Sequence, residues 1–211
     1  MARQKSIPLT NHEVSELISV NEQATKSESV KYDPLLRTAF LWSQLGWGLT
    51  PLEASMLRIA DTAFSNGSMA IKSNGRTLYA PPPAFSILNR YYEWRCLKGS
   101  DKHDFFFEGG SGSQFKVIEV DNKGSNKSPS LRPTEAYGLL KEAMGLASIK
   151  ESCSVLSLKE THLEGLFKAG ASPDEIATYM NMNVIVARRK REIFYSRLSI
   201  KERISELYPA L

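Results

Sequence analysis

The segment between Ala169 and Arg191 constrains the fold most, because it predicts two helices joined by a tight connection. The run Ser172 to Glu175 is a strong helix start, with a hydroxyl cap, a proline at the first helical position and two carboxylates near the positive end of the helix dipole. A second helix is predicted over 184–198 and carries four consecutive cations at 188–191. A helix pair whose second member is basic commonly presents side chains to a DNA groove, so we expect this end of the chain to bind phosphate.

The composition is that of an ordinary globular protein. With 211 residues, of which 42% are apolar and 24% charged, the chain is long enough to bury a sizeable core. A net charge of +4 and a pI of about 9.0 permit contact with nucleic acid without requiring it. No apolar run approaches the roughly 18 residues of a membrane span, and Cys96 and Cys153 lack partners at metal-ligating spacing. These features predict a cytoplasmic protein that does not enter a membrane.

The chain is predicted to begin with a flexible arm. Residues 1–30 are polar and show no sustained hydrophobic period, which allows at most a short helix around 12–20. From Tyr32 onward the pattern becomes regular. We therefore divide the chain into an N-terminal arm over 1–30 and one domain over 31–211.

The domain opens with helices and then changes period. Apolar residues recur at helical spacing from Tyr32 to Gly46, and a capping box at Thr50 opens a helix predicted to run to about Ala60. Alternation with a period of two follows over 69–72 and 76–80, on either side of the Asn74-Gly75 turn. An Asn-Gly pair between two alternating runs is a strong hairpin signal. The chain therefore belongs to the mainly α class with a small antiparallel β-sheet (α+β).

The remainder is predicted to be mostly helical. The aromatic run 105–107 reads as a short buried strand or turn, 115–120 as a further strand, and 121–130 as a polar loop. Helices are expected at about 84–97, 132–147, 157–169, 173–181 and 184–198, with a short one near 200–207.

The order of these elements carries more information than any single motif. The segments that carry it are Gly48–Ala54, Ile71–Pro83, Asp104–Phe107, Glu135–Ala143 and Leu158–Met182. In this order they resemble the catalytic domain of the tyrosine recombinase (phage integrase) family. The resemblance implies a tyrosine-recombinase catalytic-domain-like fold, an integrase-catalytic-like DNA-binding domain over 31–211, double-stranded DNA as partner, and a phage, plasmid or transposon setting. It leaves a homo-oligomer open.

The sequence departs from this family at the positions that cut DNA. The family has an arginine where Thr50 stands, a His-x-x-Arg pair where Leu156 to Lys159 stand, and a Leu-Gly-His step where Met180 to Met182 stand. Lys72 matches the hairpin lysine of the family. Tyr195 matches its nucleophile, although it lies about four residues beyond the family spacing.

These losses predict DNA binding without cleavage. Breaking a phosphodiester bond requires cations that stabilise charge on the phosphate oxygens, and losing one such donor costs on the order of 2.7–4 kcal/mol of barrier. Lys159 is a poor substitute for a guanidinium that binds phosphate with two hydrogen bonds. We therefore expect a transcriptional regulator or an accessory factor of a mobile element. The alternatives are an active recombinase that uses Tyr195, and a protein-interaction module with Trp94 and Phe107 as anchors.

The candidate DNA contacts are cations from three distant segments, which we expect to converge on one concave face. No metal site is expected, because the three histidines lack companions at ligand spacing, and no motif indicates a cofactor. The predicted DNA-binding residues are Lys72, Arg76, Lys159, Arg188, Arg189, Lys190 and Arg191.

Overall fold

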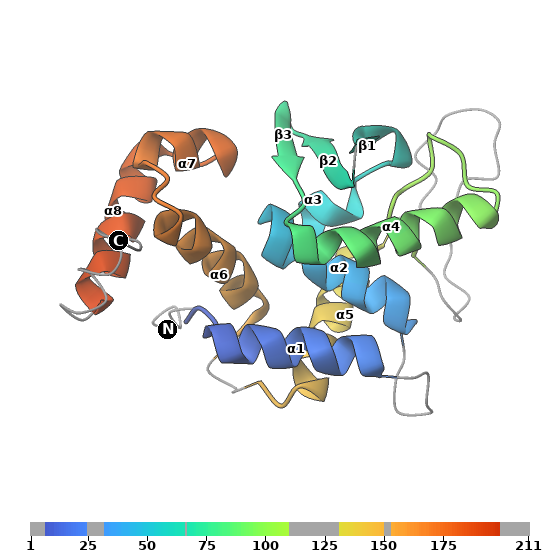
Figure 1. The fold of residues 1–211 in the computed structure, drawn as a ribbon, viewed down its shortest axis with the longest axis horizontal. Coiled ribbons are helices and arrows are strands. Elements are labelled where there is room, and N and C mark those ends of the chain that lie inside the picture. Colours follow the sequence, from blue (N-terminus) through green and yellow to red (C-terminus); the bar gives the residue numbers. More distant parts are fainter. Residues whose placement is uncertain (1–6, 25–31, 66, 110–130, 150–152, 199–211) are drawn as a thin grey trace.

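The computed structural model, which describes residues 7–24, 32–65, 67–109, 131–149 and 153–198, is a set of helices with a three-stranded sheet at one edge (Figure 1). The predicted class, mainly α with a small antiparallel sheet, is confirmed. Within those ranges, every helix is too short or too polar to cross a lipid bilayer. The elements are α1 (Asn11–Gln23), α2 (Pro34–Trp47), α3 (Pro51–Ser55), a 3-10 turn (Ile59–Asp61), β1 (Thr62–Ser65), β2 (Ser68–Ser73), β3 (Arg76–Tyr79), α4 (Pro82–Leu97), α5 (Pro133–Leu146), α6 (Val155–Lys168), α7 (Pro173–Tyr179) and α8 (Val184–Arg197).

The predicted helix starts are confirmed at two positions. The Thr50 hydroxyl accepts a hydrogen bond from the Glu53 amide, and the Ser172 hydroxyl accepts one from the Glu175 amide, each at 3.2 Å. The carboxylate of each glutamate in turn accepts a hydrogen bond from the backbone amide of the cap residue. These reciprocal bonds satisfy amide groups that the first turn of a helix leaves unpaired, so α3 and α7 begin where the sequence predicts.

The sheet has one more strand than the sequence predicts. The hairpin of β2 and β3 forms as expected, with positive φ at Asn74 (51°) and Gly75 (74°). The helix expected to reach Ala60 ends instead at Ser55, and β1 follows and pairs with β2 in an antiparallel manner. The Leu57 carbonyl oxygen accepts a hydrogen bond from the Phe106 amide at 2.7 Å. This carbonyl is therefore paired with a distant segment and not with the next turn of a longer helix.

Helix α2 is the centre of the main core. It packs against α1, α4, α5 and α6, and Phe40 and Trp47 are fully buried. Phe106 and Phe107 are buried as predicted, with the Phe107 ring 4.9 Å from that of Phe40. The end of α6 shares a second, smaller core with α7 and α8, and Figure 1 shows these helices set to one side of the sheet. The residues of this second core are Leu163, Phe167, Ile176, Met180, Ala187 and Phe194.

Within the predicted arm, residues 7–24 include helix α1, at the place where the sequence allows a short helix. Helix α1 lies against α2 and α5, with Leu17 and Asn21 fully buried. The Leu9 amide also donates to the Thr161 hydroxyl at 2.8 Å. The amphipathic pattern of this helix is weak, and a buried asparagine serves where an apolar residue is usually found. The rest of 1–30, the strand expected at 115–120, the loop at 121–130 and the helix near 200–207 lie outside the described residues.

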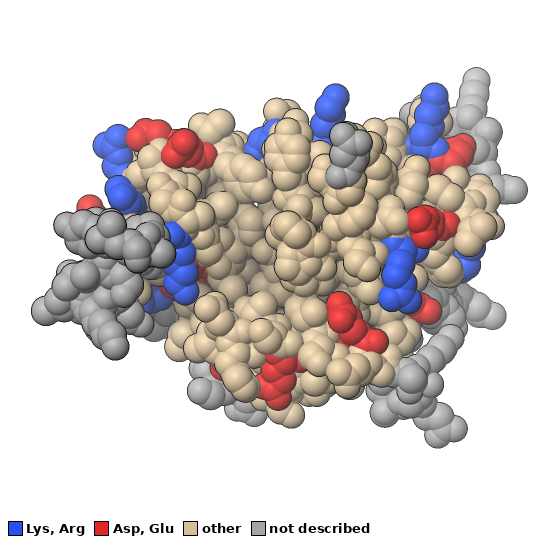
Figure 2. Space-filling model, viewed as in Figure 1, with Lys and Arg blue, Asp and Glu red and all other residues tan. Residues whose placement is uncertain are grey.

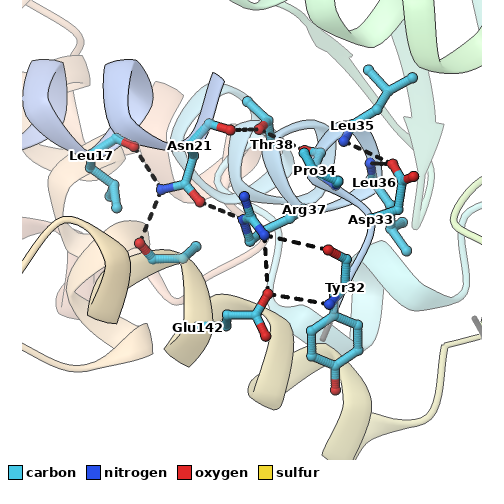
Figure 3. A network of polar contacts seen from close by, with 11 residues as sticks. Leu17, Asn21, Tyr32, Asp33, Pro34, Leu35, Leu36, Arg37, Thr38 and Glu142 are labelled. Carbon is cyan, nitrogen blue, oxygen red and sulfur yellow. Dashed lines mark hydrogen bonds and ion pairs between the residues drawn. The ribbon is translucent and has the colours of Figure 1, made fainter. Parts of the chain in front are cut away.

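A buried polar network joins α1, α2 and α5 (Figure 3). The Arg37 side chain is fully buried in α2; its Nε donates to Asn21 Oδ1 at 2.7 Å, and its Nη1 lies 3.0 Å from Glu142 Oε1. Asn21 donates in turn to the carbonyl oxygens of Leu17 at 2.7 Å and Ala143 at 3.0 Å. A buried charge is tolerated only when it is paired and hydrogen-bonded. The network therefore fixes the positions of three helices around one guanidinium.

Replacing Glu142 with alanine should destabilise the protein strongly. The Glu142→Ala variant leaves the buried Arg37 guanidinium without its anionic partner, which costs about 3–5 kcal/mol in free energy of unfolding. Urea denaturation measures this loss. The exposed neighbour Lys141 supplies the control, since Lys141→Ala should change the free energy by less than about 0.5 kcal/mol. Equal effects of the two substitutions would contradict the role given to the ion pair.

Candidate nucleic-acid interface

Arg76 lies where the hairpin meets α3 and α7. Its side chain is only 9% exposed, and its Nη2 lies 2.8 Å from Glu53 Oε1. Its Nη1 donates to the Tyr179 carbonyl oxygen, also at 2.8 Å. Arg76 thus connects β3 to α3 and α7, which lie far apart in the sequence. The predicted DNA contact of Arg76 stays a prediction, and in this structure its guanidinium is bound to these two partners.

Lys159 lies half-buried on α6 among charges of both signs. Burial lowers the pKa of its ammonium group, Glu53 and Glu160 raise it, and Arg76 and Lys190 lower it again. Because such effects weaken with distance, Arg76 and Lys190 both lie within electrostatic range of Lys159. Two carboxylates that the sequence analysis did not place at the site lie among them.

Glu53 carries a negative charge in this cluster. Burial alone would raise the pKa of its carboxyl group, but the hydrogen bonds from Thr50 and the cations Lys159 and Arg76 hold that pKa below its usual value. Its Oε1 also accepts a hydrogen bond from Asn74 Nδ2 at 3.2 Å. The carboxylate therefore fixes the hairpin turn and offsets part of the positive charge around it.

The cations of α8 divide between two faces of the helix. Lys190 Nζ lies 2.5 and 2.6 Å from the two carboxylate oxygens of Glu160 on α6. Lys190 shares this inner face with the buried Ala187 and Phe194, as the helical period requires. The other three cations of the run are exposed: Arg188, Arg189 and Arg191.

The outward cations of α8 are held loosely. Arg188 lies 3.6 Å from Asp174, with both side chains more than half exposed. The Arg191 guanidinium lies 5.3 Å from the centre of the Tyr195 ring. Lys72, on β2, is exposed as well. In Figure 2 the charged side chains lie around the margins of the face shown, and its centre is mostly uncharged.

Tyr195 belongs to the second core. Its ring lies 5.1 Å from that of Phe194 and packs at the edge of the cluster formed by α6, α7 and α8. Within the described residues it makes no hydrogen bond or ion pair with Lys159 or Arg76. The role of Tyr195 as a nucleophile stays an untested alternative that this placement does not favour.

His162 holds α6 against the end of α2, a role that sequence reasoning missed. Its Nδ1 lies 2.9 Å from the Leu45 carbonyl oxygen, to which it donates, and its ring stacks on Tyr179 with 5.9 Å between the ring centres. Burial lowers the pKa of His162 to about 4, so the imidazole is neutral near pH 7. Gly48 permits this approach, because its φ is +62° and a Cβ there would overlap the imidazole.

Gly48→Ala should therefore destabilise the protein more than an alanine at another left-handed glycine. Gly75 is the matched control: its φ is +74°, and a Cβ there meets nothing within 4 Å. Gly75→Ala then measures the backbone cost alone, about 1–2 kcal/mol, and Gly48→Ala should cost about 1–3 kcal/mol more through overpacking. Thermal or urea unfolding of both variants measures the difference. Equal losses would show that α6 does not depend on this contact.

Several solved structures share this arrangement. The XerA recombinase superposes with a TM-score of 0.67 at 14% identity, over 99% of this chain and 64% of that one. The Tn1549 transposon integrase, solved in complex with circular intermediate DNA, superposes with a TM-score of 0.64 at 12% identity, over 98% of this chain and 66% of that one. The integrase from mycobacterium phage Brujita superposes with a TM-score of 0.53 at 17% identity, over 93% of this chain and 60% of that one.

The likeness concerns structure rather than sequence. No family model matches the chain, and no curated protein matches it. The chain spans less than two thirds of the XerA and Brujita integrase chains. Since the structural match extends over nearly the whole chain, the protein has a tyrosine-recombinase-like fold.

Proposed function

We propose that this protein binds double-stranded DNA through α8 and its surroundings and does not cut it. The observation that carries the proposal is the set of exposed guanidinium groups at Arg188, Arg189 and Arg191 on one helix. Lys72 and Lys159 supply further positive charge. Phosphate contacts from such groups supply most of the affinity of non-specific DNA binding. The Tn1549 integrase with a similar fold was solved in complex with DNA, which supports the same class of partner here.

The charges around Lys159 support the proposed absence of cleavage. A scissile phosphate needs donors that stabilise developing negative charge, and a nearby carboxylate opposes that charge. Here Thr50 replaces a family arginine, Arg76 is bound to Glu53, and Lys159 lies between Glu53 and Glu160. One ammonium group beside two carboxylates is a weaker phosphate site than the guanidinium groups of the family, which supports the proposal.

The proposed role is that of a transcriptional regulator or an accessory factor of a mobile element. Its support is an analogy with the transposon and phage integrases of similar fold. A fold alone does not fix a function, so the role rests on this analogy rather than on the site.

The exposed arginines of α8 should dominate DNA affinity. In an electrophoretic mobility shift at low salt, Arg188→Ala/Arg189→Ala/Arg191→Ala should weaken binding by about 100-fold, since three phosphate contacts are lost. The slope of log affinity against log salt concentration should also flatten by about 3. Lys190 is left unchanged because it holds α8 to α6.

A matched control removes the same charge elsewhere. Arg90, Lys98 and Lys102 are exposed on or just after α4, and their triple alanine variant loses the same three positive charges. Its affinity should fall only slightly. An equal loss in both triple variants, or wild-type protein that binds no duplex at low salt, would overturn the proposal.

The protein should form no covalent adduct with DNA. A nicked duplex that the wild type binds traps the intermediate of a tyrosine recombinase, because the departing strand cannot return. A denaturing gel should show no protein linked to DNA. An adduct that disappears in Tyr195→Phe would establish cleavage and would favour the enzyme instead.

A further inference from the structure

Helices α7 and α8 form a helix-turn-helix unit. Residues 180–183 connect them, and Asn181 within this turn has a φ of +49°. Asn183 caps α8 by accepting a hydrogen bond from the Ile185 amide at 2.8 Å. Ile176 and Ala187 are buried between the two helices, and Figure 1 shows α7 lying across the start of α8. A short turn between two crossed helices is the arrangement that places a second helix in a DNA groove.

The first turns of α8 expose apolar side chains beside the arginines. Ile185 is 70% exposed and Val186 is 45% exposed. Arg189 lies one helical turn beyond Ile185 and therefore shares its face. A single exposed aliphatic residue is common on protein surfaces. Two adjacent β-branched residues at the start of a basic helix form a small apolar surface framed by cations.

The charge around this surface favours DNA over a second copy of the chain. Two α8 helices packed face to face would bring Arg188, Arg189 and Arg191 against the same groups of the other copy, and like charges repel. The major groove of DNA instead offers phosphates on both sides of a floor that carries the apolar methyl groups of thymine. The pattern of apolar centre and cationic flanks fits that groove.

We propose that Ile185 and Val186 contact thymine methyl groups in the major groove and so give this protein a sequence preference. This inference rests on the proposed DNA binding. Arg188 and Arg191 contact phosphates and hold the helix in place, whereas the two aliphatic side chains distinguish thymine from other bases. Contacts to phosphate carry no sequence information by themselves, so specificity needs such base-edge contacts.

The test compares thymine with uracil, which lacks only the methyl group. Wild-type protein selects a preferred site from a pool of random duplexes, and affinities are then measured for that site with thymine or with uracil. The wild type should lose about fourfold in affinity for each contacted methyl removed. Ile185→Ala/Val186→Ala should lose about tenfold on the thymine site and show no further loss on the uracil site.

Two controls separate this inference from the proposed function. The double variant should bind random duplex as tightly as the wild type, since the phosphate contacts remain, and circular dichroism should show an unchanged fold. Leu97→Ala, which removes an 88% exposed leucine at the end of α4, should alter neither affinity.

Each other outcome is decisive. If the wild type binds no duplex, the proposed function fails and the inference with it. Binding without a preferred site, or a uracil site bound as tightly as the thymine site, overturns the inference and leaves DNA binding intact. A dimer that sediments as such and is lost in the double variant would show that a second copy covers this surface.

Discussion

The buried charge of Arg37 is the constraint on which the rest of the molecule depends. Because its guanidinium must be satisfied inside the core, α1 and α5 are fixed around α2. Helix α2 then ends at Gly48, whose missing side chain admits the His162 ring and seats α6. Glu160 on α6 in turn holds α8 through Lys190. A series of polar contacts thus connects the core to the basic helix, beside the apolar core shared by α6, α7 and α8.

Local chemistry made much of the fold predictable from sequence. The caps at Thr50 and Ser172 and the Asn74-Gly75 turn each satisfy their own backbone within a few residues, so their outcome depends little on the rest of the chain. Strand β1 pairs with the adjacent β2 across a turn that contains Gly67, whose φ is +76°, so part of its signal is local. The end of α3 and the packing of α1 depend on partners far along the chain, such as Phe106 for the segment before β1 and Thr161 for Leu9, and no local pattern encodes those contacts.

The candidate site was predictable to the same extent. Four adjacent cations on a helix must occupy several faces, which explains why Lys190 points toward α6 while Arg188 and Arg189 face outward. The partners of the inward groups were not predictable, because Glu53 and Glu160 are assigned to Arg76 and Lys190 only by tertiary structure. The net charge calculated from the composition includes every cation, whereas in the folded protein some of them are paired with carboxylates. The exposed basic surface is therefore smaller than the sequence suggests.

The seat of α8 on α6 has a consequence for how ionic strength acts on this protein. Lys190 and Arg197 join Glu160 and Glu164 in pairs that stay partly open to solvent, so dissolved ions screen them. Higher salt then weakens both the attachment of α8 to α6 and the electrostatic attraction of α8 to DNA. In a titration with salt, the slope of log affinity against log salt concentration would therefore be steeper than the protein–phosphate contacts alone predict. The excess slope would report the contribution of the α6–α8 ion pairs.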